Sequence, residues 1–151
     1  MQYSEMTFVC RIVESINKII DKEKLPFDRA DAEIEIEGGR ADLIIWVRRK
    51  LEPALLIEVE RPEGELQEFF PQVKAKAQRG RIPYFALWNV RQFRLWETPY
   101  LGEDCKFYDS RYDKVVINRS VDLEDAMDYH ERDVEDFLKC FLVEFVHIYQ
   151  A

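Results

Sequence analysis

The sequence is poor in the residues that build the commonest catalytic centres and metal sites. It has only two histidines, His130 and His147, and three widely separated cysteines, Cys10, Cys105 and Cys140. These cysteines have neither a zinc-site spacing nor a disulfide framework, and two late histidines give no convincing catalytic triad. A Walker loop, a dinucleotide-binding glycine fingerprint and internal repeats are also absent. The acids are therefore the main candidates for chemistry.

Long apolar runs and net positive charge are missing as well. No run approaches the roughly 18 apolar residues of a membrane span, and no charged-then-apolar leader is present, so we predict neither a membrane span nor a secretion signal. Unpaired cysteines fit a reducing cytoplasm. The formal net charge is −8 and the pI is about 4.9, whereas a stand-alone, high-affinity nucleic-acid binder normally has a basic surface.

The remaining composition is that of a globular protein. The chain has 151 residues, of which 47% are hydrophobic and 34% are charged. A chain of this length can bury a substantial core, and we predict a single domain over residues 1–151.

Two short apolar segments, residues 43–47 and 54–59, are predicted to be the strands that carry the candidate site. Both are rich in branched aliphatic residues and are bounded by glycine, charge or proline, which is typical of buried strands. The polar residues 48–53 between them predict a turn, so the two strands are expected to be antiparallel neighbours.

Acids stand at one end of this predicted hairpin. Asp42 begins the first strand, and Glu58 and Glu60 end the second. Because side chains alternate along a strand, Glu58 and Glu60 share a face with Ala54 and Leu56. Clustered carboxylates repel one another unless a cation lies among them, and Mg²⁺ prefers oxygen ligands. The pattern predicts a divalent metal site suited to phosphodiester hydrolysis.

The order of these residues resembles the metal site of the PD-(D/E)XK nuclease superfamily. Asp42, a strand, a turn and Glu58-Val59-Glu60 are similar to the pattern of the N-terminal nuclease domain of type I restriction subunits and of Mrr-like endonucleases. Gln72 on the following helix and a strand–turn–strand over 82–96 add to the likeness, which covers roughly residues 4–97. The resemblance implies an α/β, restriction-endonuclease-like fold: an α-βββ-α-β core with a mixed sheet flanked by helices.

The resemblance also implies an activity and a set of roles. The chain would be a Mg²⁺-dependent DNA endonuclease of a restriction or related DNA-processing system, with Mn²⁺ as a substitute. Asp42 and Glu58 would hold the ion together with the Val59 carbonyl, and Glu60 would be a third carboxylate or a water-orienting base. Gln72 would position the water or the backbone.

The sequence departs from the family pattern at two positions that matter. Glu60 stands where a catalytic lysine is usual, and Lys76 stands where a tyrosine follows the helical glutamine. Lys76 shares a helix face with Gln72 and would either reach inward to replace the missing lysine or remain solvated. Glu5, on the first helix, would either face the metal or serve as a first-turn acid favoured by the helix dipole.

The rest of the chain predicts the elements around this centre. A helix is expected from Ser4, with Met6, Val9, Val13, Ile16 and Ile20 recurring at helical spacing, and a half-exposed strand over 32–37. A helix over 64–79, irregular at Pro71, is expected to end with Gly80 as a C′ glycine. Further strands are predicted over 82–88, 92–97 and 115–117, and a C-terminal helix over about 122–151. Its broad apolar face would cover the sheet, form a dimer surface or lead into a further domain.

Three functions remain open at this point. The first is the DNA endonuclease, with a homodimer or a larger restriction-type assembly as its setting and no membrane partner. The second is a catalytically inactive module on the same fold that binds DNA or protein, which the acidic pI and Glu60 favour. The third is an acid-rich domain whose carboxylates pair with Arg40, Arg48 or Arg61.

Overall fold

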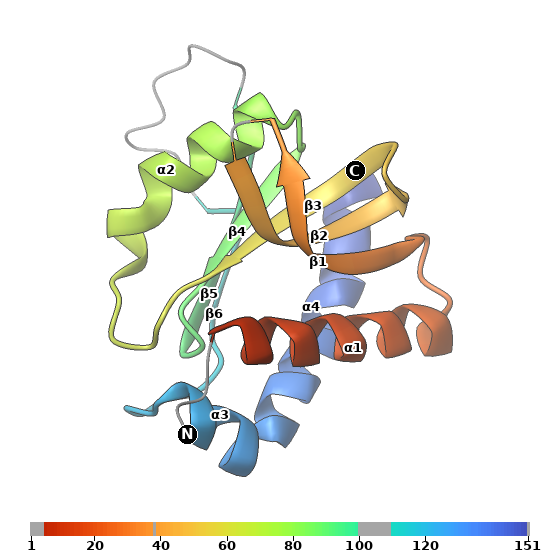
Figure 1. Ribbon diagram of the computed structural model, residues 1–151. Coiled ribbons are helices and arrows are strands. Elements are labelled where there is room, and N and C mark those ends of the chain that lie inside the picture. The colour runs from red at the N-terminus through yellow and green to blue at the C-terminus, as the bar shows by residue number, and fades with distance from the viewer. Residues whose placement is uncertain (1–4, 38, 100–109, 151) are drawn as a thin grey trace.

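A computed structural model describes residues 5–37, 39–99 and 110–150 as a mixed six-stranded sheet with helices on both faces (Figure 1). The strands follow the order of the sequence across the sheet. They are β1 (Arg29–Ile36), β2 (Gly39–Arg48), β3 (Glu52–Val59), β4 (Tyr84–Trp88), β5 (Gln92–Glu97) and β6 (Tyr112–Val115). The helices are α1 (Glu5–Glu23), α2 (Leu66–Arg79), α3 (Leu123–Tyr129) and α4 (Glu131–Gln150).

The topology confirms the predicted α-βββ-α-β core. Strands β1, β2 and β3 form an antiparallel meander, and β3 pairs with β4 in parallel. A parallel pair needs a crossover connection, which α2 supplies. Strands β5 and β6 then continue the sheet in antiparallel pairing.

Each face of the sheet has its own core. On one face, Phe8, Ile12 and Ile16 of α1 pack with Leu43 and Ile57. On the other face, Val73 and Ala77 of α2 pack with Ile44, Leu56 and Phe85. The division follows the alternation of side chains along each strand, so residues of the β3 sequence contribute to both cores.

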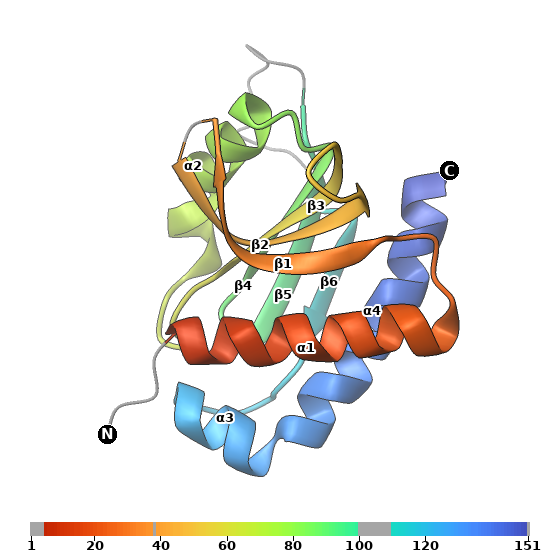
Figure 2. The same ribbon diagram turned by 45° about the vertical axis from the view of Figure 1, so that its right-hand side comes forward.

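The C-terminal helix covers the sheet rather than leaving its apolar face open. Figure 2 shows α1 and α4 together on the face opposite α2. Phe137, Phe141 and Phe145 of α4 are buried, and the Phe141 and Phe93 ring centroids are 4.5 Å apart. Of the three alternatives for the apolar face of residues 122–151, this packing favours the one in which it covers the sheet.

The predicted single C-terminal helix is wrong in its continuity. The chain leaves the helical conformation at His130, with φ −125° and ψ 18°, so that α3 and α4 are separate helices. Asp122 is the N-cap of α3 and accepts a hydrogen bond from the Asp125 N–H at 2.7 Å. The His130 ring lies between Arg119 and Asp133, which gives the break tertiary hydrogen-bond partners.

Other corrections are local. Gly80 ends α2 as predicted, but as the C-cap residue in a right-handed conformation (φ −79°, ψ −4°) rather than at C′. Met6 is 39% exposed and Phe8 takes its place in the core, while Ala54 belongs to the core opposite Leu56. The predicted strand over 115–117 lies earlier, as β6. Ser4 lies outside the described residues.

Pro71 lies within α2 at an exposed position, and the α-helix runs unbroken from Leu66 to Arg79, so the irregularity predicted at Pro71 does not interrupt it. In the part of the chain that the structure describes, no helix combines the length and the apolar character that crossing a membrane requires.

Candidate active site

Neighbouring strands bring Asp42 and Glu58 together at the same end of the sheet. The β2–β3 register pairs Leu43 with Ile57, which puts Asp42 beside Glu58. The Val59 N–H donates to Asp42 Oδ2 at 2.9 Å, and the Asp42 N–H donates to Glu58 Oε2 at 3.3 Å. Each carboxylate is thus held by the backbone of the other's strand, as the predicted hairpin required.

Helix α2 contributes a cation to the pair. Lys76 Nζ lies 2.5 Å from Glu58 Oε1 and donates a second hydrogen bond to the Arg40 carbonyl at 2.7 Å. The side chain of Lys76 is 24% exposed and that of Glu58 is 6% exposed. Lys76 therefore reaches inward, and the solvated alternative is wrong.

The protonation of Glu58 is strongly perturbed. Burial, a hydrogen bond with the Asp42 side chain and the Asp42 charge together raise the pKa of Glu58 to about 8, while Lys76 opposes them. Desolvation and a nearby like charge both disfavour an ionised carboxylate. Near neutral pH the Asp42–Glu58 pair consequently retains a proton that a bound cation would displace.

Glu60 belongs to the same electrostatic group. Burial raises its pKa, followed by the charges of Glu5 and Asp42, while Lys76 lowers it. Its backbone N–H donates to the Trp88 carbonyl at 2.8 Å, which continues the β3–β4 alignment beyond the last residue of β3. Carboxylates whose pKa values are perturbed in this way are common at functional sites.

The other predicted site residues stand at different distances from this centre. Glu5 forms an ion pair with Arg61, at 3.2 Å between Oε1 and Nε, and its charge acts on Glu60. Gln72 is exposed on α2, one turn before Lys76. Val59 contacts the site through its backbone N–H, which donates a hydrogen bond to Asp42. The roles of Glu5 in metal binding, of Gln72 and of the Val59 carbonyl stay predictions.

Among the described residues, the cation in contact with Glu58 is Lys76, and of the three arginines considered from the sequence only Arg61 pairs with a candidate site acid, Glu5. Arg40 pairs with Glu33 at 3.0 Å, and Arg48 pairs with Glu52 at 3.3 Å. Arg61 pairs with Glu5, as described above. Exposed pairs of this kind contribute little to stability, typically about 0–1 kcal/mol.

The residues present fit a hard divalent cation in donor chemistry. Mg²⁺ is usually bound by one or two carboxylates and keeps several waters, and Asp42 and Glu58 supply two carboxylates from neighbouring positions of β2 and β3. Among the residues that the structure describes, no group of three or more His, Cys, Asp or Glu side chains is arranged to hold a metal ion. A site that also includes Glu60 or Glu5 as a ligand stays a prediction.

Comparison with known structures identifies a similar fold. Along 93% of its length the chain is similar to the crystal structure of the type IIG restriction endonuclease BpuSI, with a TM-score of 0.66 and 12% sequence identity. The chain has a restriction-endonuclease-like fold. It covers 17% of the BpuSI chain, and at 12% identity the likeness concerns the fold alone. No protein-family model matches the sequence, and no curated protein matches it.

Two supporting groups were not singled out from the sequence. The Arg40 carbonyl holds Lys76, and the buried side chain of Asn89 donates to the Gly64 carbonyl at 2.9 Å and accepts from the Gln92 N–H at 2.7 Å. Asn89 thereby ties the β4–β5 turn to the loop that leads from Glu60 to α2. The sequence shows only that Asn89 lies in a predicted turn. Its contact with the Gly64 carbonyl could not be predicted, because it depends on how the crossover between β3 and β4 folds.

Proposed function

We propose that this chain is a nuclease module that hydrolyses phosphodiester bonds of DNA with a bound Mg²⁺ ion, for which Mn²⁺ can substitute. The observation that carries the proposal is the placement of Asp42 and Glu58, each held by a backbone N–H of the other's strand, with Lys76 Nζ 2.5 Å from Glu58. The restriction-endonuclease-like fold supports it, since a type IIG restriction endonuclease has a similar structure along 93% of this chain.

Asp42 and Glu58 would hold the ion, with the Val59 carbonyl as a further ligand and Glu5 at the edge of the site. The ion, when bound, lowers the pKa of water and offsets negative charge on the phosphate. Lys76 is placed to stabilise the charge that develops during attack, because its ammonium group already lies among the acids. It is the cation on α2 that replaces the lysine missing at Glu60.

Glu60 would act as the proton acceptor for the attacking water. Its raised pKa brings the carboxylate closer to the neutral range in which a general base works best. Gln72, exposed on α2 one turn before Lys76, would orient the water or the DNA backbone.

For this chain to act on DNA, a cationic surface must attract the DNA, either on a partner or at one part of the chain itself. A net charge of −8 opposes the approach of DNA. We propose that a second copy or a larger restriction-type assembly supplies affinity and the second cut of a duplex.

The test is cleavage of a supercoiled plasmid in Mg²⁺ or Mn²⁺, with nicked and linear products measured over time. Asp42→Ala and Glu58→Ala should lower the rate by a factor of at least about 100, as expected when a group essential to the chemistry is removed. Glu52→Ala, which removes an exposed carboxylate at the opposite end of β3, is the matched control and should cleave like the wild type. Equal rates in all four proteins would reject the assignment.

A second candidate is a catalytically inactive module that binds DNA or protein through the same fold. Two observations favour it: Glu60 replaces the usual lysine, and Lys76 contacts the Glu58 oxygen that an ion would need. Calorimetry separates the candidates. No heat of ion binding at millimolar Mg²⁺, together with tight binding to a DNA duplex, would support the inactive module.

A further inference from the structure

Arg61 follows Glu60 directly, where the chain leaves β3 at the candidate active site. It is three residues after Glu58, so the Cα atoms of the two residues are at most about 11 Å apart. Consecutive nucleotides of one DNA strand are about 3.4 Å apart along the helix axis. A strand whose scissile phosphate lies at Glu58 therefore has further phosphates at the distance of Arg61.

The backbone from which the Arg61 side chain extends is held in a closely packed turn. The Gly64 N–H donates to the Arg61 carbonyl at 2.9 Å, and the Gly64 carbonyl accepts from the Asn89 side chain at 2.9 Å. Pro62 is buried within the turn. A Cβ added to Gly64 would lie 3.0 Å from the Phe69 ring and 3.2 Å from the Arg61 carbonyl. The turn is thus ordered without a ligand, which lowers the cost of binding one.

The guanidinium group of Arg61 has one partner and retains free donors. Its Nε lies 3.2 Å from Glu5 Oε1, and the Arg61 side chain is 56% exposed. In the described part of the chain, Glu5 is the only side chain paired with Arg61. After burial, the charge of Glu5 raises the pKa of Glu60, so this ion pair lies within electrostatic reach of the site acids. The two terminal nitrogens of Arg61 form a planar fork that matches two oxygens of a phosphate, and they remain available to a ligand.

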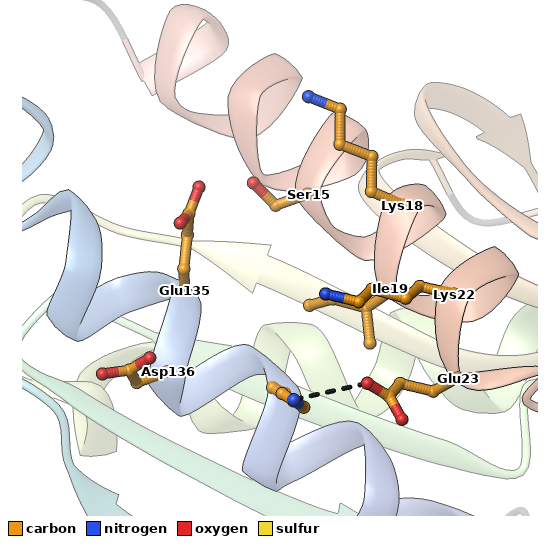
Figure 3. A pocket seen from close by; sticks show the side chains of 8 residues that line it. Ser15, Lys18, Ile19, Lys22, Glu23, Glu135 and Asp136 are labelled. Carbon is orange, nitrogen blue, oxygen red and sulfur yellow. Dashed lines mark ion pairs between the residues drawn. The ribbon is translucent and has the colours of Figure 1, made fainter.

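The cations that line the groove between α1 and α4 are in a different situation. Figure 3 shows Lys18, Lys22 and Glu23 of α1 facing Glu135 and Asp136 of α4 across this groove. Its three lysines are balanced by three acids. Lys18 lies about 20 Å from Glu5 along α1, at about 1.5 Å per residue. The α1–α4 groove therefore has no excess of positive charge, and it is remote from Arg61.

We propose that Arg61 binds a phosphate of the DNA strand close to the bond that is cut. The two terminal nitrogens bind oxygens of that phosphate, and Glu5 holds the Nε side of the guanidinium. Glu5, Asp42 and Glu60 place negative charge at this end of the sheet, which repels a DNA strand, and the exposed guanidinium offsets that repulsion. A phosphate contact contributes affinity and register but reads no base. That this phosphate adjoins the scissile bond rests on the proposed function, whereas the binding of a DNA phosphate by Arg61 does not.

The experiment measures binding of a short fluorescein-labelled DNA duplex by anisotropy over a series of salt concentrations, with EDTA present so that cleavage plays no part. Arg61→Gln should bind at least about fivefold more weakly than the wild type. Its slope of log affinity against log salt should become shallower by about 0.9, the value for one lost phosphate contact. Arg61→Lys keeps the charge but loses the fork, so it should keep the wild-type slope and have an intermediate affinity. The matched control is Arg48→Gln, which removes another exposed arginine paired with a single acid and should bind like the wild type.

Plasmid cleavage in Mg²⁺ separates this inference from the nuclease assignment. A raised KM with an unchanged kcat in Arg61→Gln is the result expected of a residue that binds the substrate. Wild-type affinity and salt slope in Arg61→Gln, an equal loss in Arg48→Gln, or no duplex binding by the wild type at low salt would overturn the inference. Weaker duplex binding by Arg61→Gln, together with no cleavage by the wild type, would sustain the Arg61 contact and reject the nuclease assignment. Cleavage by the wild type with an unchanged KM in Arg61→Gln would do the reverse.

Discussion

Replacing Glu58 with glutamine should change how stability depends on pH. The pKa of Glu58 is raised to about 8 in the folded protein, from an ordinary value of 4.5. Between those two pH values the folded state binds more protons than the unfolded state, so the stability of the wild type falls as pH rises. Glutamine cannot ionise, and the Glu58→Gln protein lacks this component of the pH dependence.

The magnitude follows from the width of that window. One proton bound in the folded state but not in the unfolded state changes the free energy of unfolding by about 1.4 kcal/mol per pH unit. Between pH 5.5 and pH 8 the free energy of unfolding of the wild type should therefore fall by about 3 kcal/mol relative to that of Glu58→Gln. Glu58 is only 4% exposed, so solvent screening reduces this figure little.

Urea unfolding of both proteins at half-unit steps from pH 5.5 to pH 8 measures the difference directly. The other titrating groups are common to both proteins and cancel in the comparison. Glu52→Gln, at an exposed ion pair with Arg48, is the control and should run parallel to the wild type. Parallel curves for the wild type and Glu58→Gln would refute the reasoning, because they would mean that Lys76 keeps Glu58 ionised throughout this range.

Three further substitutions have expected outcomes. Lys76→Met should raise the pKa of Glu58 further, because Lys76 lowers it in the wild type. A carboxyl NMR titration of Glu58 that is shifted to lower pH would contradict this. Plasmid cleavage by the same protein should fall at least about 100-fold. Leu56→Ala, at a fully buried position beneath α2, should cost roughly 2–5 kcal/mol in urea unfolding, and a loss below 1 kcal/mol would mean that the core there is poorly packed. Asn89→Ala removes two hydrogen bonds and should cost roughly 1–3 kcal/mol, whereas an unchanged midpoint would show that the Gly64 loop holds without them.

The hairpin that carries Asp42 and Glu58 could be predicted because its causes are local. Strand alternation fixes which side chains share a face, and a short polar turn makes the two strands antiparallel. These two features are sufficient to predict that Asp42 and Glu58 lie at the same end of the sheet. The crossover through α2 follows equally directly, since a strand, a helix and a strand give a parallel pair.

The partner of Glu58 could not be fixed in the same way. Whether Lys76 points inward depends on how α2 rotates about its axis when Val73 and Ala77 pack on Leu56. Helix spacing shows that Gln72 and Lys76 share a face, but not what that face meets. The hydrogen bond from Lys76 to the Arg40 carbonyl likewise depends on the bend of the β1–β2 hairpin toward α2 (Figure 1).

The break between α3 and α4 has a similar explanation. The residues on both sides of His130 have helical patterning, so a continuous helix was the simplest prediction. Arg119 lies in the segment between β6 and α3, and its contact with the His130 ring is long-range in origin. Tertiary hydrogen bonds of this kind override the local helix propensity, and no pattern in the sequence predicts them.

Binding of Mn²⁺ at pH 8.5 tests the central claim most directly. Electron paramagnetic resonance of free Mn²⁺ should show one ion bound per chain in the wild type, with binding lost in Asp42→Ala and in Glu58→Ala. Titrations in buffers of different ionisation enthalpy at pH 7 should in addition show proton release, because the ion replaces the proton on Glu58. Equal Mn²⁺ binding by the wild type and both variants, or no binding by any of them, would contradict the assignment of Asp42 and Glu58 to a metal-dependent nuclease centre.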